Sequence, residues 1–260
     1  MAYVMLSRCE KLENIHIVGK FDPKYIRCDE KALVETERIY ENFVASKARE
    51  DSIFQNCFTI SYLNIYKLKK HYEDIITDHR LIQSDIMAFG ETWLLPDENV
   101  SFENYGFQDF HVNIGPGKGI AASIKQHHQV TYKESYAANF SAILMKTDIL
   151  DVIFLYLSQK FEWNDLKDKL EEWIEEDRSV TVIGDMNIDY LRKNHDFIKY
   201  MKIKNFAQLV DKPTHKCGGL LDQIYVNQCL IKKKPFCTQR SVMHSDHDII
   251  VLHVPNNVCR

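Results

Sequence analysis

Short apolar runs recur from about residue 58 to residue 254, and they constrain the fold more than any other feature of the chain. Each has the length of a β-strand and is too short to span a membrane as a helix. Amphipathic segments of helical spacing separate groups of these runs, which predicts two packed β-sheets flanked by helices, an α+β four-layer α/β sandwich. The runs are 58–65, 84–91, 119–125, 129–135, 141–148, 151–158, 179–185, 220–227 and 248–254.

Helical periodicity appears at 67–79, at 164–177 and near 195–204. In the second of these segments Leu166, Leu170 and Trp173 share one face, and Asn164 precedes them as a predicted N-cap. We expect Trp93, like Trp173, to be a core residue rather than a base-stacking one.

The first fifty residues have a different pattern from the rest. Asp29 is a predicted N-cap for a helix that runs to about Ala48. The charged segment 46–51 follows, and without glycine or proline it suits either a boundary or an extension of the helix. We therefore predict two parts, residues 1–48 and residues 52–256.

Composition excludes several classes of protein. A net charge of −4 gives no overall basic surface, so any contact with nucleic acid has to come from local clusters of lysine and arginine. The seven cysteines show no C-x-x-C spacing, which predicts free thiols in a reducing compartment and no structural zinc site. The chain shows no signal peptide and no membrane span, so we expect a soluble intracellular protein.

Polar side chains follow several of the apolar runs at the points where the strands end. Strand ends of packed sheets open into a common crevice, where sites in layered folds tend to form. Oxygen ligands without thiolates suit a hard cation such as Mg²⁺, and this donor set suits hydrolysis of a phosphate ester. Taken singly, each motif is also a common turn sequence. The residues are Asn64, Glu91, Asp185, Asn187, Asp246 and His247.

The order of these motifs along the chain resembles the endonuclease/exonuclease/phosphatase superfamily, in particular the apurinic-endonuclease-like domains of non-LTR retrotransposons. The likeness covers roughly residues 54–255 and implies a DNase I-like fold. The motifs that carry it are Asn64, "ETWL", "GKGIAAS", "FLYLS", "GDMN", "PTH", "LDQIYV" and "SDH".

The resemblance implies a divalent metal site. Glu91 would be the principal Mg²⁺ ligand, with Asn64 and Asp246 nearby, and Mn²⁺ is an alternative ion. Tyr66 stands where some relatives place an acidic residue, two positions after the asparagine.

The resemblance also implies roles for five catalytic residues. Asp185 would orient or deprotonate the attacking water, and Asn187 would hold water or phosphate beside it. His247 would bind the scissile phosphate with support from Asp222, because a neighbouring carboxylate stabilises the protonated imidazole. Tyr156 matches a tyrosine that contacts phosphate in the family.

Residues 2–40 are similar to the C-terminal end of Helitron-type DNA helicases, in which an arginine corresponding to Arg8 reaches the nucleotide phosphates. The chain has no G-x-x-x-x-G-K-[ST] loop, and "GPGKG" at 115–119 is expected to be a turn. This layout resembles a Helentron-like transposon protein, of which the chain would be a C-terminal remnant or a truncated gene model. The implied location is the nucleus.

Three functions follow as hypotheses. The first is a Mg²⁺-dependent DNA endonuclease that nicks DNA, with DNA as its partner and with no membrane and no obligate protein partner. The second is a phosphomonoesterase or phospholipid phosphodiesterase of the same fold, because fold and site chemistry are shared across substrates. The third is a catalytically decayed transposon remnant.

Overall fold

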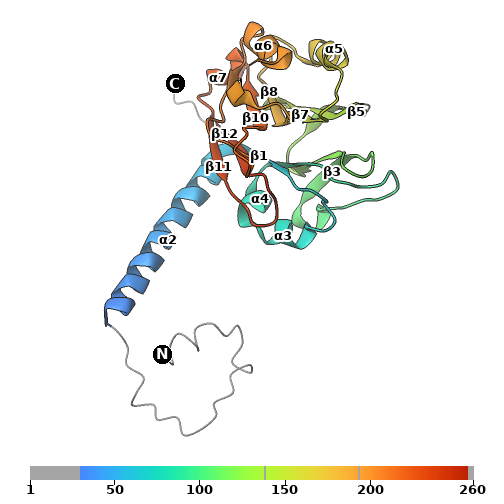
Figure 1. The fold of residues 1–260 in the computed structure, drawn as a ribbon. Coiled ribbons are helices and arrows are strands. Elements are labelled where there is room, and N and C mark those ends of the chain that lie inside the picture. The colour runs from blue at the N-terminus through green and yellow to red at the C-terminus, as the bar shows by residue number, and fades with distance from the viewer. Residues whose placement is uncertain (1–29, 138, 193, 257–260) are drawn as a thin grey trace. The chain divides into compact units, whose positions relative to one another are not determined.

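The computed structural model describes residues 30–137, 139–192 and 194–256 (Figure 1). The chain divides into two compact units, Met1–Ser52 and Ile53–Arg260. Helix α2 (Glu30–Asn56) runs unbroken through 46–51, so that segment extends the helix instead of forming a linker. The predicted cap Asp29 and the predicted nucleotide-contacting Arg8 lie outside the described residues.

The second unit is built from two six-stranded sheets. Parallel pairing joins β1 to β2 and β7 to β8, and the other pairs are antiparallel. In sheet order the first contains β11 (Phe236–Arg240), β12 (Ile249–Pro255), β1 (Cys57–Asn64), β2 (Ile86–Gly90), β4 (Ile120–Lys125) and β3 (Phe107–Val112). The second contains β5 (Val130–Ala137), β6 (Phe140–Thr147), β7 (Asp151–Leu157), β8 (Val180–Asp185), β10 (Asp222–Val226) and β9 (Ala207–Gln208).

All nine predicted strand runs are confirmed, and β3, β9 and β11 were not predicted. These three strands lie at sheet edges, where only one neighbour is present and the apolar pattern is weak. The side chains of β11, for example, are all exposed or half-buried. An edge strand of this kind gives little hydrophobic signal in the sequence.

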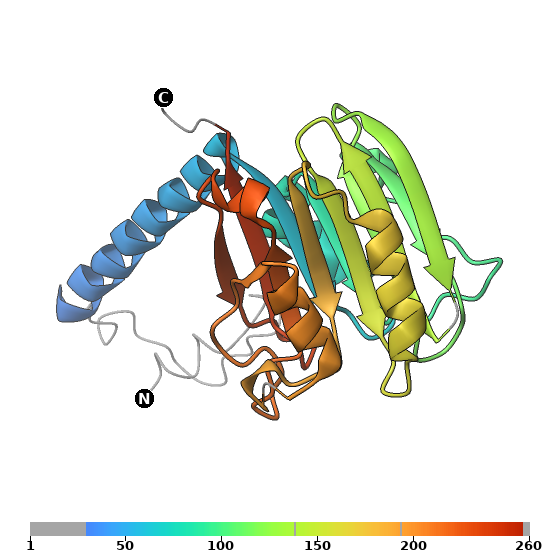
Figure 2. The ribbon, with the colours of Figure 1, turned by 90° about the horizontal axis from the view of Figure 1, so that it is seen from above.

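Helices cover the outer faces of the two sheets. The short helices α3 and α4 pack on the first sheet, and α5 and α6 pack on the second, in front of whose strands they lie in Figure 2. The helices are α3 (Tyr72–Thr77), α4 (His79–Gln83), α5 (Trp163–Trp173), α6 (Asp196–Ile203) and α7 (Gln228–Ile231), with 3₁₀ turns η3 (Glu103–Tyr105) and η4 (Tyr190–Arg192).

Two details of the predicted helices are wrong. The segment 67–79 does not form one helix, because Asp78 adopts an extended conformation between α3 and α4 and its side chain accepts a hydrogen bond from the backbone N–H of Arg80. Glu162, not Asn164, occupies the N-cap position of α5. The predicted inward face of α5 is confirmed, since Leu166, Leu170 and Trp173 are buried.

Two further predictions concern cysteines and membrane spans. The described cysteines Cys57, Cys217, Cys229 and Cys237 are all free thiols, as predicted. No helix among the described residues combines the length and the apolar character needed to cross a bilayer.

The main core lies between the two sheets, and strand alternation decides which side chains reach it. In β7, Phe154 and Tyr156 enter this core, whereas Ile153 and Leu155 pack beneath the helices on the outer face. In β8, Ile183 likewise lies between the sheets. The strand ends that follow these positions therefore point their inward side chains into the gap between the sheets.

Gly184 allows β7 and β8 to pair closely. A Cβ atom at this position would lie 1.8 Å from the backbone carbonyl oxygen of Leu155, its partner in the parallel ladder. We expect Gly184→Ala to lower the free energy of unfolding by about 3 kcal/mol, because backbone atoms have to move apart to make room. Urea denaturation measures this.

The matched control is Gly219→Ala. Its Cβ would meet the flexible side chain of Leu221 at 3.3 Å and no backbone atom, so we expect a loss below about 1 kcal/mol. Equal losses for the two variants would show that the close approach at Gly184 is unimportant.

Candidate active site

Three of the predicted site residues meet because they occupy inward positions at strand ends. Asn64 lies two residues after the core residue Tyr62 on β1, and Asp185 lies two residues after Ile183 on β8. Tyr156 on β7 pairs in register with Asp185. The two sheets thus contribute to one site from facing surfaces.

Asp185 accepts hydrogen bonds on both carboxylate oxygens. The side-chain amide of Asn64 donates to Oδ2 at 2.8 Å, and the backbone N–H of Asn187 donates to Oδ1 at 2.8 Å. Asn187 is fixed in turn, since its Nδ2 donates to the carbonyl oxygen of Leu157 at 2.7 Å. Asp185 is 1% exposed, so the carboxylate is held rigidly and nearly without water.

A second carboxylate and an imidazole lie beside Asp185. Asp222 on β10 is its direct antiparallel partner, and Asp222 Oδ2 lies 2.8 Å from Nδ1 of His247. Ligand atoms of these three residues all lie within 4.8 Å of one another, and all three side chains are buried. Thr214 Oγ1 accepts the backbone N–H of Asp222, which fixes the start of that strand.

This arrangement raises two pKa values, which favours the neutral form of the carboxyl group and the charged form of the imidazole. Burial, then the charge of Asp222, raises the pKa of Asp185 to about 7, against the effects of His247 and the hydrogen bonds from Asn187 and Asn64. Burial lowers the pKa of His247, but the charge and hydrogen bond of Asp222 outweigh it and raise this pKa to about 9. Near neutral pH the imidazole is therefore protonated and Asp185 is poised to exchange a proton.

Glu91 joins the site through Tyr156. The tyrosine hydroxyl lies 2.9 Å from Oε1 of Glu91 and 3.1 Å from the carbonyl oxygen of Gly117. Burial and then the charge of Glu91 raise the pKa of Tyr156 far above its ordinary value, so the phenol stays protonated. The "GPGKG" segment is a turn before β4, as predicted, and Gly117 in it borders the site.

The backbone around the site is strained. Of the seven non-glycine residues with positive φ in the described part of the chain, five follow the ends of β1, β2 and β8. Such conformations cost about 1–3 kcal/mol each and persist where surrounding structure enforces them, often at functional sites. The five are Tyr66, Lys67, Glu91, Trp93 and Asn187.

The side chains present fit a hard divalent cation. Glu91 accepts a hydrogen bond on Oε1 and Asn64 donates one from Nδ2. The other side-chain oxygens, Oε2 of Glu91 and Oδ1 of Asn64, receive no hydrogen bond from the described residues. Oδ1 of Asp222 is buried and likewise has no partner in the described part of the chain. Carboxylate and amide oxygens are the donors that Mg²⁺ prefers.

Asp246, a predicted metal ligand, lies differently from Glu91 and Asn64. Its side chain is 57% exposed, and its Oδ2 lies 3.3 Å from Nε2 of His215. His215 itself forms an isolated β-bridge with His247, and the two rings meet edge to face. The structure therefore groups the carboxylate of Asp246 with the two histidines.

We expect Asp246→Asn to lower metal-dependent activity by about 10-fold or less, because an exposed carboxylate contributes little to charge stabilisation. Steady-state rates over a range of Mg²⁺ concentrations measure this. The comparison is with Glu91→Gln. A loss as large as the one for Glu91→Gln would place Asp246 among the principal ligands.

The sequence prediction missed several residues that support the site. The buried hydroxyl of Tyr62 packs against Gly90 at the end of β2, so closely that a Cβ atom on Gly90 would lie 2.1 Å from it. Ser245 Oγ donates to the carbonyl oxygen of Asn64 at 2.6 Å and accepts the N–H of His247 at 3.0 Å, so it ties these segments together. Tyr62 could have been found from its spacing of two from Asn64, whereas the role of Ser245 depends on the folded chain.

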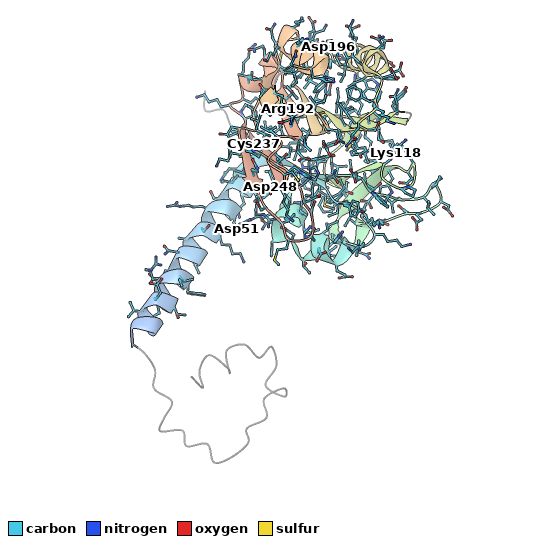
Figure 3. All side chains as sticks on the ribbon, viewed as in Figure 1. Asp51, Lys118, Arg192, Asp196, Cys237 and Asp248 are labelled. Carbon is cyan, nitrogen blue, oxygen red and sulfur yellow. The ribbon has the colours of Figure 1, made fainter. Side chains whose placement is uncertain are left out.

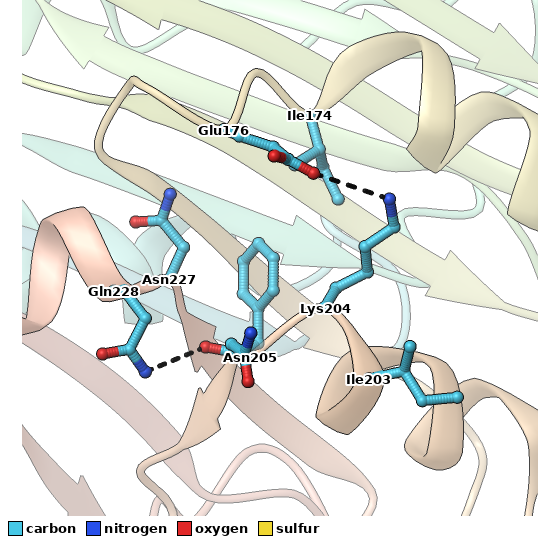
Figure 4. A pocket seen from close by; sticks show the side chains of 8 residues that line it. Ile174, Glu176, Ile203, Lys204, Asn205, Asn227 and Gln228 are labelled. Atoms are coloured by element: carbon cyan, nitrogen blue, oxygen red, sulfur yellow. Dashed lines mark hydrogen bonds and ion pairs between the residues drawn. The ribbon is translucent and has the colours of Figure 1, made fainter.

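A groove of about 660 Å³ opens beside Asn187. Its lining includes Phe161, Arg192 and His215, and Arg192, labelled in Figure 3, is highly exposed. A smaller pocket of about 260 Å³ lies by the start of β8, where the Asn227 N–H bonds to Val180. Figure 4 shows two polar pairs in its lining, Lys204 with Glu176 and Gln228 with the carbonyl of Asn205.

Comparisons with known proteins identify the fold. No protein-family model and no curated protein matches the sequence. Among solved structures, an AP endonuclease from Archaeoglobus fulgidus has a TM-score of 0.61 at 16% identity, with 77% of this chain and 100% of that chain covered. The endonuclease domain of TRAS1, a telomere-specific non-LTR retrotransposon, has a TM-score of 0.56 at 14% identity, with 76% and 98% covered.

A third neighbour is an endonuclease/exonuclease/phosphatase family protein from Leptotrichia buccalis C-1013-b, with a TM-score of 0.55 at 14% identity and coverage of 75% of this chain and 98% of that chain. Identities of this size speak for the fold alone. Two mixed β-sheets with flanking helices, shared with these structures over nearly their whole length, give this chain the DNase I-like fold of endonuclease/exonuclease/phosphatase proteins.

Proposed function

We propose that the chain is a Mg²⁺-dependent phosphodiesterase that nicks DNA. The observation that carries the proposal is the buried cluster of Asp185, Asp222 and His247, which is hydrogen-bonded to Asn64 and borders the Glu91–Tyr156 pair. It combines a carboxylate able to accept a proton, a cationic imidazole and oxygen atoms suited to a divalent ion. Hydrolysis of a phosphate ester uses all three.

Glu91 and Asn64 would hold the ion, with Mn²⁺ as an alternative to Mg²⁺. When bound, the ion supplies positive charge that polarises a phosphoryl oxygen. Asp185 accepts a proton from the attacking water, for which its raised pKa is well matched near neutral pH. Asn187 fixes the orientation of that carboxylate through its backbone N–H.

His247 and Tyr156 act on the phosphate. The imidazolium donates a hydrogen bond from Nε2 to an oxygen on which negative charge builds up, while Nδ1 is held by Asp222. The Tyr156 hydroxyl, which keeps its proton, donates to Glu91 and lies ready to contact the same phosphate. Asp222 acts through His247 and is a positioning residue.

DNA is the proposed substrate. Two observations favour it over small phosphate esters: the neighbours described as an AP endonuclease and as the endonuclease domain of a retrotransposon, and the order of the site motifs in the sequence. We extend the proposal to an origin in a mobile element and to action in the nucleus. The N-terminal likeness to Helitron-type helicases supports this origin.

Incubation of the purified chain with supercoiled plasmid tests the proposal. We expect open-circular product with Mg²⁺ and none with EDTA, and we expect Glu91→Ala and Asp185→Ala to abolish it. Release of phosphate only from small monoesters, or hydrolysis only of phospholipid, would assign the chain to another activity of the fold. Absence of any metal-dependent hydrolysis would support a decayed remnant.

A further inference from the structure

Two aromatic residues and a lysine lie on the loops that leave β1 and β2 at the candidate active site. The loops are tied together by backbone hydrogen bonds, from Lys67 N to the carbonyl of Glu91 at 3.0 Å and from Ile65 N to the carbonyl of Gly90 at 3.1 Å. Trp93 follows Glu91 by two residues, and its backbone N–H donates a hydrogen bond to the carbonyl oxygen of Lys118 at 3.0 Å. These side chains are thus carried by the same backbone that carries Glu91.

The aromatic rings form one cluster with the lysine. The rings of Tyr66 and Trp93 meet edge to face at 4.9 Å between centroids. The ammonium of Lys67 lies 4.4 Å from the centroid of Trp93 and 5.4 Å from that of Tyr66. We name these three residues the aromatic platform.

The platform is at the surface, contrary to the sequence prediction that Trp93 is a core residue. Tyr66 is 45% exposed and Trp93 is half-buried, whereas Trp173 is 2% exposed in the core. The indole nitrogen of Trp93 lies on the buried side of the ring and has no acceptor among the described residues. All three platform residues have positive φ, so strained backbone holds large aromatic groups at the rim of the site.

Two lysines without carboxylate partners accompany the aromatic rings. In the described part of the chain, neither Lys67 nor the exposed Lys118 has a carboxylate within ion-pair distance, whereas the nearby Lys69 pairs with Glu98 at 3.1 Å. Figure 3 labels Lys118, which lies in the turn next to Gly117. A partly exposed aromatic pair beside ammonium groups that lack carboxylate partners matches a nucleotide chain, whose bases stack and whose phosphates carry charge.

We propose that the aromatic platform binds an unpaired DNA base next to the scissile phosphate, and that Lys67 and Lys118 contact the neighbouring phosphates. The proposal rests on the proposed function, because it assigns single-stranded or locally unpaired DNA as the substrate of that site. In a duplex both faces of an interior base are covered by its neighbours. An exposed ring therefore selects strands whose bases are free to stack on protein.

Binding measurements test the platform without requiring cleavage. The full chain is titrated in EDTA against fluorescein-labelled oligodeoxythymidylate, and separately against its duplex with oligodeoxyadenylate, by fluorescence anisotropy. We expect Trp93→Ala and Tyr66→Ala each to weaken binding of the single strand by about 5- to 100-fold and to affect the duplex much less. Trp93→Phe keeps a stacking ring and should retain most of the affinity.

The matched control is Tyr105→Ala, which removes an exposed tyrosine from the 3₁₀ turn η3, outside the platform. It should bind both probes like the unsubstituted chain. In addition, the single strand should quench indole fluorescence, and Trp93→Phe should abolish the quenching while Trp163 and Trp173 still emit. Thermal melting of each variant by circular dichroism identifies any that are unfolded.

Salt dependence tests the two lysines. Lys67→Ala and Lys118→Ala should each reduce the slope of log affinity against log salt concentration by about 0.7 for the single strand. Lys202→Ala, on the exposed face of α6, should leave the slope unchanged.

The platform is wrong if Trp93→Ala binds the single strand as tightly as Tyr105→Ala does, or if it loses single strand and duplex to the same extent. These results are separate from those of the plasmid assay. Platform-dependent binding without any metal-dependent cleavage would overturn the proposed function and leave the platform standing. Metal-dependent cleavage, with DNA binding that does not change in Trp93→Ala and Tyr66→Ala, would overturn the aromatic platform and support the proposed function.

Discussion

Glu91→Gln is expected to lower Mg²⁺-dependent cleavage of DNA by about 1,000-fold or more, because it removes the charge of the carboxylate proposed as the principal metal ligand. The amide has the same shape, and its Oε1 can still accept the hydrogen bond that Tyr156 donates at 2.9 Å. Asp185→Asn should cost about 100- to 10,000-fold, since an amide cannot accept the proton of the attacking water.

Single-turnover rates on a labelled oligonucleotide, measured across Mg²⁺ concentrations, separate the two losses. Glu91→Gln should also weaken binding of Mn²⁺, followed by electron paramagnetic resonance, whereas Asp185→Asn should change the rate more than the metal affinity. Glu103→Gln, on the η3 turn, is the control for loss of one acidic charge. Activity of Glu91→Gln within about tenfold of the unsubstituted chain would remove Glu91 from the metal site.

Asp222→Asn and His247→Gln are each expected to lower the rate by about 100- to 1,000-fold, the usual cost of losing one preorganised donor to developing negative charge. Asp222 and His247 form a buried hydrogen bond. The carboxylate of Asp222 is therefore the main reason that the imidazole carries a charge at neutral pH. Removal of that charge leaves only the smaller effects of Asp185 and Asp246 to oppose burial, which disfavours the imidazolium.

The pH dependence follows with a definite sign. The pKa of His247 is raised from 6.5 to about 9, so the catalytic imidazolium is present below that pH and activity falls as the pH rises through about 9. In Asp222→Asn the largest of the charges that oppose burial is gone, so this alkaline fall should move to lower pH. The acidic limb should lie near pH 7, where protonation of Asp185 removes the base.

Profiles of log rate against pH for the unsubstituted chain and for Asp222→Asn check this assignment. Asp248→Asn removes a nearby carboxylate whose Oδ2 accepts from Gln239, and it should leave the alkaline fall in place. An alkaline limb that is the same in Asp222→Asn and in the unsubstituted chain would show that His247 does not act as an imidazolium. Melting temperatures guard against loss of folding in the variants.

The central strands and most helices were predictable from the sequence, because buried strands leave short apolar runs and helices leave a periodic apolar pattern. All eight residues of β1 and all seven of β7 are buried, and both runs are evident in the sequence. The edge strand β3 has two buried end residues around exposed and half-buried ones, so its pattern is weak. The break at Asp78 was missed because the sequence does not distinguish an aspartate that caps a helix from one inside a helix.

For the site, the sequence indicated the residue types and their positions at strand ends, but not all of the partners. Their positions at strand ends implied that Asn64 and Asp185 open into a common crevice, and the structure joins them by a 2.8 Å hydrogen bond. The pairing of Asp246 with His215 was not predictable, because it depends on an isolated bridge between two loops. The half-buried position of Trp93 also went against the expectation that it is a core residue.

By itself the sequence determined a two-sheet sandwich and a set of oxygen-bearing side chains at strand ends, because burial and strand periodicity are written in the local pattern of apolar residues. Only the tertiary structure decided which of those side chains share a site, how strongly Asp222 charges His247, and that Tyr66 and Trp93 meet at the surface. These properties depend on distances between residues far apart in the chain, and on the exclusion of water between the two sheets. Both are set only once the sheets have packed against each other.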